Sequence, residues 1–245
     1  MLTEDRIISN YKEHEDLINT YIQDQPRRDK IFKMLNTLGE DYVVAPASSK
    51  TWHHNSFPGG YVDHVNRVVK FAFKIKDLYK DFEGNVDFTD EELAFAAIFH
   101  DLGKIGDGEK FNYQPQTDNW RREKLQENYT YNPDLQFMLI PDRSLYILQK
   151  FGITVTQKEW LGIRLHDGVF DKANEAYFFS NIESSRQKTN IVSVLHTADF
   201  LASKAEYDIL KNSTQVSNKP NPTPRSNSKP QIKSNKNFED ILKNI

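Results

Sequence analysis

Hydrophobic residues recur at intervals of three and four along most of the first 210 residues, which is the period of an amphipathic α-helix. This spacing predicts helices over residues 3–22, 26–38, 61–81, 89–100, 120–128, 141–151, 156–166 and 190–210. No segment alternates clearly between hydrophobic and polar residues, as a half-buried strand does. The pattern therefore predicts an all-α fold, a helical bundle.

Capping residues and turn-forming residues support the predicted helix boundaries and the loops between the helices. Thr89 and Glu92 have the spacing of a capping box, in which each side chain satisfies a free backbone N–H at the start of a helix. The same spacing recurs at Thr156 and Glu159. Residues 41–60 contain two prolines and paired glycines, so they are predicted to form a loop. Among the residues assigned to core-facing stripes are Tyr79, in the third helix, and Ile209, in the last.

The composition changes after residue 211. Residues 212–236 carry five basic residues, no acidic ones and few hydrophobic ones, so they are predicted to form a disordered linker. Residues 237–245 regain hydrophobic spacing, which predicts a short terminal helix, with a frayed terminus as the alternative. The sequence thus predicts one helical domain over residues 1–211 followed by a tail that could dock on a protein partner.

Charge and composition narrow the functional classes. Residues 1–211 hold 26 basic and 33 acidic residues, and such an acidic body disfavours binding to duplex nucleic acid. No hydrophobic run approaches the ~18 residues of a membrane helix, and the charged N-terminus lacks the hydrophobic stretch of a signal peptide. A cytoplasmic protein without membrane contact is expected. The chain has no cysteine, so a metal would need histidine or carboxylate ligands.

Histidine and aspartate residues lie near or beside the predicted core-facing stripes at three places. His100 and Asp101 end the fourth predicted helix, His64 lies in the first turn of the third, and Asp199 lies on the last. Such groups on separate helices of a bundle can converge on one ion. Two histidines and two aspartates would leave coordination positions free for water and a phosphoryl oxygen, which hydrolysis requires.

Three segments carry this pattern in order, GGYVDHVNRVVKFA, AAIFHDLGKIG and LHTADFLASKAEYD. With these segments in this order, the chain resembles members of the HD-domain metal-dependent phosphohydrolase superfamily. The resemblance covers roughly residues 45–207. The resemblance implies an HD-domain helical bundle in which His64, His100, Asp101 and Asp199 bind a divalent metal, with Asp101 also catalytic. The donor set favours Mn, Mg, Co, Ni, Fe or Zn.

Several branches of that superfamily bind a second metal through further histidines, and His166 and His196 occupy suitable places. For His196 the alternative is a core histidine satisfied by a backbone carbonyl. For His166 the alternatives are a polar helix end, a proton donor to the leaving group or a phosphate ligand.

Basic residues near these segments are candidates for binding substrate phosphates. Lys104 follows the His-Asp pair, and the superfamily often uses such a residue there; the alternative is a cation at a helix C-terminus. Arg67 and Arg164 are further candidates for phosphate contacts, and solvated surface charges are the alternative. Lys104 and His166 join Asp101 as the predicted catalytic residues.

The predicted function is hydrolysis of a phosphate ester or anhydride of a nucleotide, a mono- or triphosphate, by a metal-activated water. One alternative is a 3′-to-5′ exonuclease on single-stranded nucleic acid, because His53 and His54 with the paired glycines resemble the lead-in of that branch. A second alternative is a scaffold protein that recruits a partner through its C-terminal tail.

Overall fold

The computed structural model describes residues 2–180 and 182–217. The chain divides into two compact units, Met1–Lys211 and Asn212–Ile245. The first unit contains every predicted site residue. The predicted short helix over residues 237–245 and most of the predicted linker lie outside the described residues.

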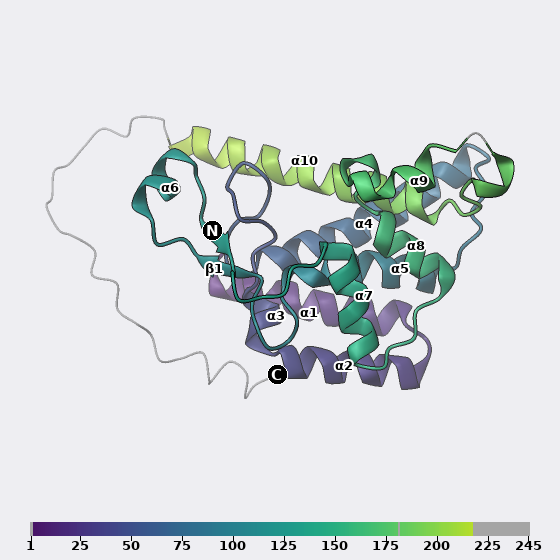
Figure 1. Ribbon diagram of the computed structural model, residues 1–245, viewed down its shortest axis with the longest axis horizontal. Coiled ribbons are helices and arrows are strands. Elements are labelled where there is room, and N and C mark those ends of the chain that lie inside the picture. Colours follow the sequence, from purple (N-terminus) through teal and green to yellow (C-terminus); the bar gives the residue numbers. More distant parts are fainter. Residues whose placement is uncertain (1, 181, 218–245) are drawn as a thin grey trace, which may run out of the picture. The chain divides into compact units, whose positions relative to one another are not determined.

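Helices dominate the first unit, as predicted (Figure 1). The α-helices are α1 (Glu4–Tyr21), α2 (Gln25–Leu38), α3 (Glu40–Val44), α4 (Gly60–Asp81), α5 (Asp90–Phe99), α6 (Asn119–Lys124), α7 (Ile140–Lys150), α8 (Gln157–Leu165), α9 (Glu175–Phe178) and α10 (Ile191–Ser217). Short 3₁₀ turns are η1 (Leu102–Lys104), η2 (Gly168–Phe170), η3 (Lys172–Asn174) and η4 (Glu183–Ser185). The prediction of an all-α fold is confirmed.

The helix ends follow the local signals in the sequence. Both capping boxes form: Thr89 and Glu92 cap α5 reciprocally, and Thr156 and Glu159 cap α8. Gly39 ends α2 with a positive φ of 54°, a conformation that glycine adopts without steric cost. Sequence alone therefore sets where these helices start and stop.

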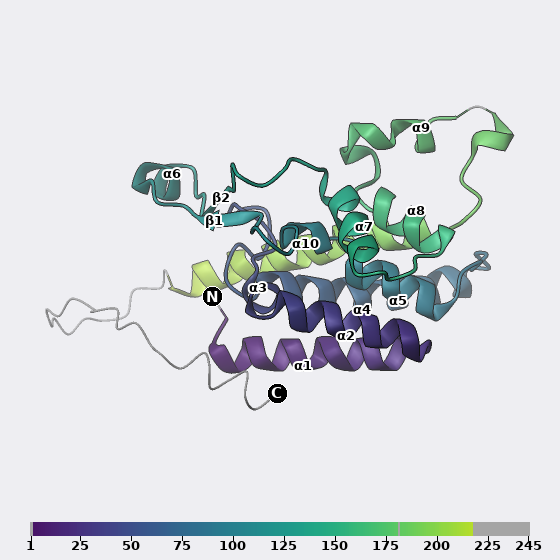
Figure 2. The same ribbon diagram turned by 60° about the horizontal axis from the view of Figure 1, so that its bottom comes forward.

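The core lies between α4 and the helices that pack on it. Helix α4 contacts α1, α3 and α5, while α5 in turn packs on α8, and α7 packs on α8 and η1 (Figures 1 and 2). Large side chains that are fully buried include Tyr42, Tyr61, Phe95 and Phe99. This packing fixes the start of α4 and the end of α5, which carry candidate metal ligands.

The structure corrects several local predictions. Residues 113–115 and 129–131 form an antiparallel pair of strands, β1 (Tyr113–Pro115) and β2 (Tyr129–Tyr131), on either side of α6. The region predicted as a loop contains the short helix α3. Tyr79 and Ile209 are exposed rather than in the core.

Helix α10 continues to Ser217, beyond the predicted end at residue 210. The first residues of the predicted disordered linker are therefore helical, because nothing in residues 211–217 breaks a helix before the first proline at 220. None of the described helices is long and apolar enough to span a membrane.

Candidate metal centre

The His-Asp pair lies where one helix ends and a tighter turn begins. His100 is the C-terminal cap of α5, and Asp101 precedes η1 with φ −106° and ψ 12°. This change of backbone direction lets two adjacent side chains face the same point, which a regular helix would not allow. Gly103 permits the turn to approach α7, because a Cβ there would lie 2.3 Å from the Ile140 carbonyl oxygen.

The four predicted ligands meet in the structure. His64 Nε2 lies 3.1 Å from Asp199 Oδ1 and 3.6 Å from Asp101 Oδ2. His100 Nε2 lies 3.3 Å from Asp101 Oδ2 and 3.9 Å from Asp199 Oδ1. Three separate elements, α4, the α5–η1 junction and α10, therefore bring two imidazoles and two carboxylates together.

The histidine rings are oriented with their Nε2 atoms toward this cluster. His100 Nδ1 donates a hydrogen bond to the Ala97 carbonyl oxygen, and His166 Nδ1 donates to that of Ile163, each over 2.8 Å. A ring whose Nδ1 carries the proton presents a lone pair at Nε2, the arrangement of a metal ligand. Nε2 of His64 and of His100 is buried and makes no hydrogen bond to any described group.

These observations fit a divalent cation. Buried imidazole nitrogens that lie beside carboxylate oxygens, without hydrogen bonds to them, have the composition and spacing of a binding site. The ligand atoms of His64, His100 and Asp101 lie within 4.8 Å of one another, as do those of His100, His166 and Asp199. The donors are nitrogen and oxygen, which suits Mg, Mn, Fe, Co, Ni or Zn.

Electrostatics in the cluster favours charged groups despite burial. Burial alone would raise the pKa of Asp199, but the neighbouring His64, His100 and His166 hold it well below the usual value. Burial would lower the pKa of His64, yet Glu206 and Asp199 raise it to about 10, so a cation that binds at Nε2 displaces a proton from this ring. The carboxylates are thus anionic and attract a positive charge.

His166 joins the cluster, whereas His196 faces a different partner. His166 Nε2 lies 3.5 Å from Asp101 Oδ1 and 3.7 Å from Asp167 Oδ2. His196 lines the same cavity, but its Nδ1 donates to the His166 carbonyl oxygen over 2.6 Å, and among the described residues it belongs to none of the groups of three side chains that could hold an ion. Of the two histidines predicted to hold a second metal, only His166 is therefore brought to the ligands; His196 has the backbone partner of the structural alternative.

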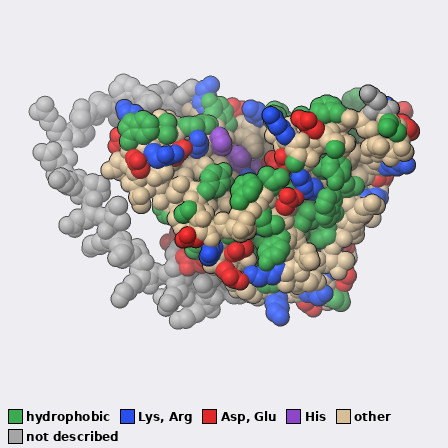
Figure 3. Space-filling view, viewed as in Figure 1, with side chains coloured by type: hydrophobic (Ala, Val, Ile, Leu, Met, Phe, Trp, Pro, Cys, Tyr) green, Lys and Arg blue, Asp and Glu red, His purple; other side chains and the backbone are tan. Residues whose placement is uncertain are grey.

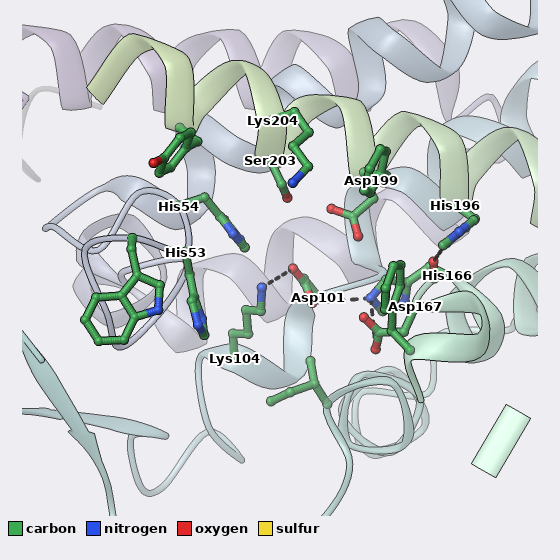
Figure 4. A pocket seen from close by; sticks show the side chains of 15 residues that line it. His53, His54, Asp101, Lys104, His166, Asp167, His196, Asp199, Ser203 and Lys204 are labelled. Carbon is green, nitrogen blue, oxygen red and sulfur yellow. Dashed lines mark hydrogen bonds and ion pairs between the residues drawn. The ribbon is translucent and has the colours of Figure 1, made fainter. Parts of the chain in front are cut away.

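A cavity of about 590 Å³ opens onto this cluster. Asp199, Ser203 and Lys204 extend from α10 on one side, opposite Asp101 and Lys104 (Figure 4). Aromatic side chains also line it, namely those of Trp52, Phe170, Phe200 and Tyr207. In the space-filling view, histidine side chains are visible within a hollow of the surface (Figure 3). The cavity combines carboxylates, cations and aromatic rings.

Lys104 occupies the predicted position beside the cluster. Its Nζ lies 2.5 Å from Asp101 Oδ2, and its side chain lines the cavity. Burial would lower the pKa of Lys104, but Asp101 raises it above its usual value, so the ammonium is retained.

Arg67 and Arg164, the two arginine candidates for phosphate binding, do not line the cavity. Arg67 Nε lies 3.1 Å from Glu206 and its Nη2 lies 3.0 Å from Asp63. Arg164 is held by Asp142 and Asp171. Both guanidinium groups are paired with carboxylates of the fold: Arg67 with one on its own helix and one on α10, and Arg164 with one on α7 and one in the turn after η2.

Some residues of the site were missed in the sequence. Ser203 and Lys204 line the cavity, and Glu206 contacts His64. Their spacing could have identified two of them: Ser203 and Glu206 lie four and seven residues after Asp199, and so they share its face of a helix. His53 and His54 also line the cavity, and the His54 ring lies 4.6 Å from that of His64.

Comparison with known protein families agrees with this geometry. Residues 61–132 match the family model of the HD domain. The chain contains an HD domain. The predicted membership of the HD-domain superfamily is thereby confirmed, and the matched segment includes three of the four converging residues, while α10 supplies the fourth. No curated protein and no solved structure matches the chain.

HD domains are in general metal-dependent phosphohydrolases, and the buried histidine and aspartate groups are compatible with metal binding. This supports an enzyme that uses a divalent metal.

Proposed function

We propose that this protein is a metal-dependent phosphohydrolase whose substrate is a nucleotide, a mono- or triphosphate. The observation that carries the proposal is the convergence of His64, His100, Asp101 and Asp199 beside a cavity that also presents cations and aromatic rings. The HD domain supports the reaction class, and the lining of the cavity supports the substrate class.

His64, His100, Asp101 and Asp199 would hold the metal, with His166 adjacent. A divalent cation there supplies Lewis acidity, which acidifies water and offsets charge on a phosphoryl group. The carboxylates of Asp101 and Asp199 provide the negative charge that would retain it.

Two lysines provide positive charge for the phosphates. Lys104 lies against Asp101 at the reacting end of the cavity, and Lys204 lies on α10 across from it (Figure 4). Ammonium groups bind phosphate oxygens as point charges. Burial would lower the pKa of His166, but Asp167 and Asp101 raise it to about 10, so its Nε2 carries a proton when no metal is bound to it. From its place beside Asp101 and Asp167, this nitrogen could deliver that proton to the leaving oxygen.

Aromatic side chains distinguish a nucleotide from a simple phosphate as the substrate. Trp52, Phe200 and Tyr207 line the same cavity as the lysines, and a base gains about 1–3 kcal/mol by stacking on such a ring. The volume of about 590 Å³ lies within the range of pockets for small ligands. A single nucleotide therefore fits the composition and the size.

The experiment is a substrate panel with the full chain and Mn²⁺ or Co²⁺. Nucleoside mono- and triphosphates and a labelled single-stranded oligonucleotide are incubated separately, and released phosphate and shortened oligomers are measured. Release of phosphate from a mononucleotide is expected, and it should stop with chelator and return with Mn²⁺. Degradation of the oligonucleotide alone would overturn the proposal in favour of an exonuclease.

A further inference from the structure

Glu206 is a buried carboxylate behind the metal centre that does not line the cavity. Only 2% of its surface is exposed. Its Oε1 and Oε2 lie 3.1 Å and 3.2 Å from His64 Nδ1, the ring nitrogen that faces away from the cluster. A buried carboxylate requires such partners, and here one of them is a candidate metal ligand.

Both nitrogens of the His64 ring face acidic side chains of the same helix. Asp199 Oδ1 approaches Nε2 at 3.1 Å, while Glu206 accepts from Nδ1–H. These two acidic residues are seven positions apart on α10, about two turns, and so they lie on one face. The position of α10 thus determines how the His64 ring, on α4, is oriented.

His64 differs in this respect from the two other histidines of the cluster. His100 and His166 each donate Nδ1–H to the carbonyl oxygen three residues earlier in their own helix. Their orientation depends on backbone, whereas that of His64 depends on a side chain. A single substitution can therefore remove the partner of His64 without altering the others.

Glu206 is itself fixed by a network of side chains. Arg67 Nε donates to its Oε1 over 3.1 Å, and Arg67 Nη2 donates to Asp63 over 3.0 Å. Asp63 also accepts from Asn10 Nδ2 on α1 and from Asn55 Nδ2 in the loop before α4, over 2.9 Å and 3.0 Å. The carboxylate behind His64 is therefore preorganised by groups from three segments.

We propose that Glu206 is a positioning residue, which fixes His64 in the tautomer and orientation that present Nε2 to the cation. This inference rests on the proposed metal centre. A carboxylate behind a metal-binding histidine contributes about 10–100-fold to metal affinity in proteins. Glutamine at position 206 would be a poor replacement, because it removes the negative charge that faces His64 and Arg67. It also puts an NH₂ group, which cannot accept a hydrogen bond, in place of one of the two oxygens that lie 3.1 Å and 3.2 Å from His64 Nδ1.

The test is calorimetric titration of the full chain with Mn²⁺. Glu206→Gln is expected to bind Mn²⁺ about 10–100-fold more weakly than wild type. Glu159→Gln is the matched control, since Glu159 is equally buried but pairs with Arg27 at 2.6 Å and does not contact the cluster. It should keep the wild-type affinity, even where it lowers the melting temperature.

A double-mutant cycle separates positioning from a general structural effect. If Glu206 acts through His64, then Glu206→Gln should cause no further loss of affinity when His64 is already alanine. Glu206→Asp provides a second variant that keeps the negative charge, with the carboxylate withdrawn by one methylene, and a loss smaller than that of Glu206→Gln is expected.

The outcomes are distinguishable. Wild-type affinity in both position-206 variants would overturn the inference, as would an additive loss in the His64→Ala background. Absence of Mn²⁺ binding by the wild-type protein would instead overturn the metal centre itself.

Discussion

The two lysines of the cavity differ in their surroundings. Lys104 is paired with Asp101 at the ligand cluster, whereas Lys204 lies over the Phe200 ring, with its Nζ 5.2 Å from the ring centre. Lys104 is therefore close to where charge changes during reaction, and Lys204 is placed to hold a more distant part of the substrate.

Substitution of each lysine should separate these roles. Lys104→Met is expected to lower kcat on the order of 10²-fold, because it removes a preorganised cation from the reacting end. Lys204→Met is expected to raise KM about tenfold with kcat little changed, as when uniform binding is lost. Steady-state kinetics with the best nucleotide of the panel decides this; an equal loss of kcat in both variants would contradict the assignment.

For individual residues, the sequence predicted the four candidate metal ligands but not all of the contacts made by the residues around them. The four candidate ligands stood out because their residue types and order carry the chemistry. The sequence did not reveal that Arg67 and Arg164 pair with carboxylates of the fold, because a charged residue near a motif does not show which way its helix turns the side chain. His196 likewise meets a backbone carbonyl, a contact that depends on the close packing of Gly168 against its ring.

Among the helices, α1 and α4 are joined by a fully buried histidine. His14 Nδ1 donates to Asn66 Oδ1 over 2.8 Å, and its Nε2 accepts from the Tyr42 hydroxyl over 2.7 Å. Asn66 is oriented for this role because its Nδ2 donates to the Asn10 carbonyl oxygen. Burial lowers the pKa of His14 to about 4, so the ring is neutral in the folded protein.

This neutral histidine predicts a pH-dependent stability. The unfolded chain binds a proton at His14 below about pH 6.5 while the folded protein does not, so stability is fully present above pH 6.5 and falls as the pH drops toward 4. The shift corresponds to about 3 kcal/mol. Urea unfolding of wild type and of the non-titrating His14→Gln variant at a series of pH values tests it. A slope in His14→Gln as steep as that of wild type would exclude this origin.

The start of α5 offers a test of local helix energetics. Thr89 Oγ1 accepts from Glu92 N–H over 3.1 Å, and Glu92 accepts from Thr89 N–H over 2.9 Å. Thr89→Ala is expected to lower the free energy of unfolding by about 1 kcal/mol, because it leaves an end of the helix uncapped. Thr37→Ala is the control: Thr37 lies inside α2, where alanine is the better helix former. Chemical denaturation measures both, and an equal effect would count against the capping role.

Periodicity and capping residues predicted the elements that are long, whereas the β1–β2 pair was missed. Each of its strands has three residues, and they are separated by the helical turn α6. So short a segment cannot show alternation, and the pairing depends on contacts between residues far apart in the sequence. The ring of Tyr113, for example, lies 5.4 Å from that of Tyr131.

For the whole molecule, every residue proposed for metal or substrate lies at or before Tyr207. Deletion of residues 218–245 is therefore expected to leave turnover of small nucleotides unchanged. The measurement compares kcat/KM of the truncated and full chains, with matching circular dichroism spectra as the control for folding. A large loss would favour a role of the tail in catalysis or in recruiting a nucleic acid or protein partner.

The convergence of distant residues is the feature that sequence could anticipate only in outline. The chemistry of the motifs predicted that α4, the end of α5 and α10 would meet, but the distances depend on how α5 packs against α4 and α8. The same packing places Glu206 behind His64, a contact that spans 142 positions in the sequence. The type of site can therefore be predicted from short sequence motifs, whereas its geometry depends on how the whole bundle packs.

The central claim is that the converging residues form one cation site, and Asp199 tests it most directly. Asp199→Asn preserves the shape of the side chain but removes the charge that α10 contributes to the cluster. Titration with Mn²⁺, followed calorimetrically, should show binding by the wild type and at least about 100-fold weaker binding by Asp199→Asn, since a ligand is lost rather than a residue behind one. Equal affinity in the two proteins would contradict the account.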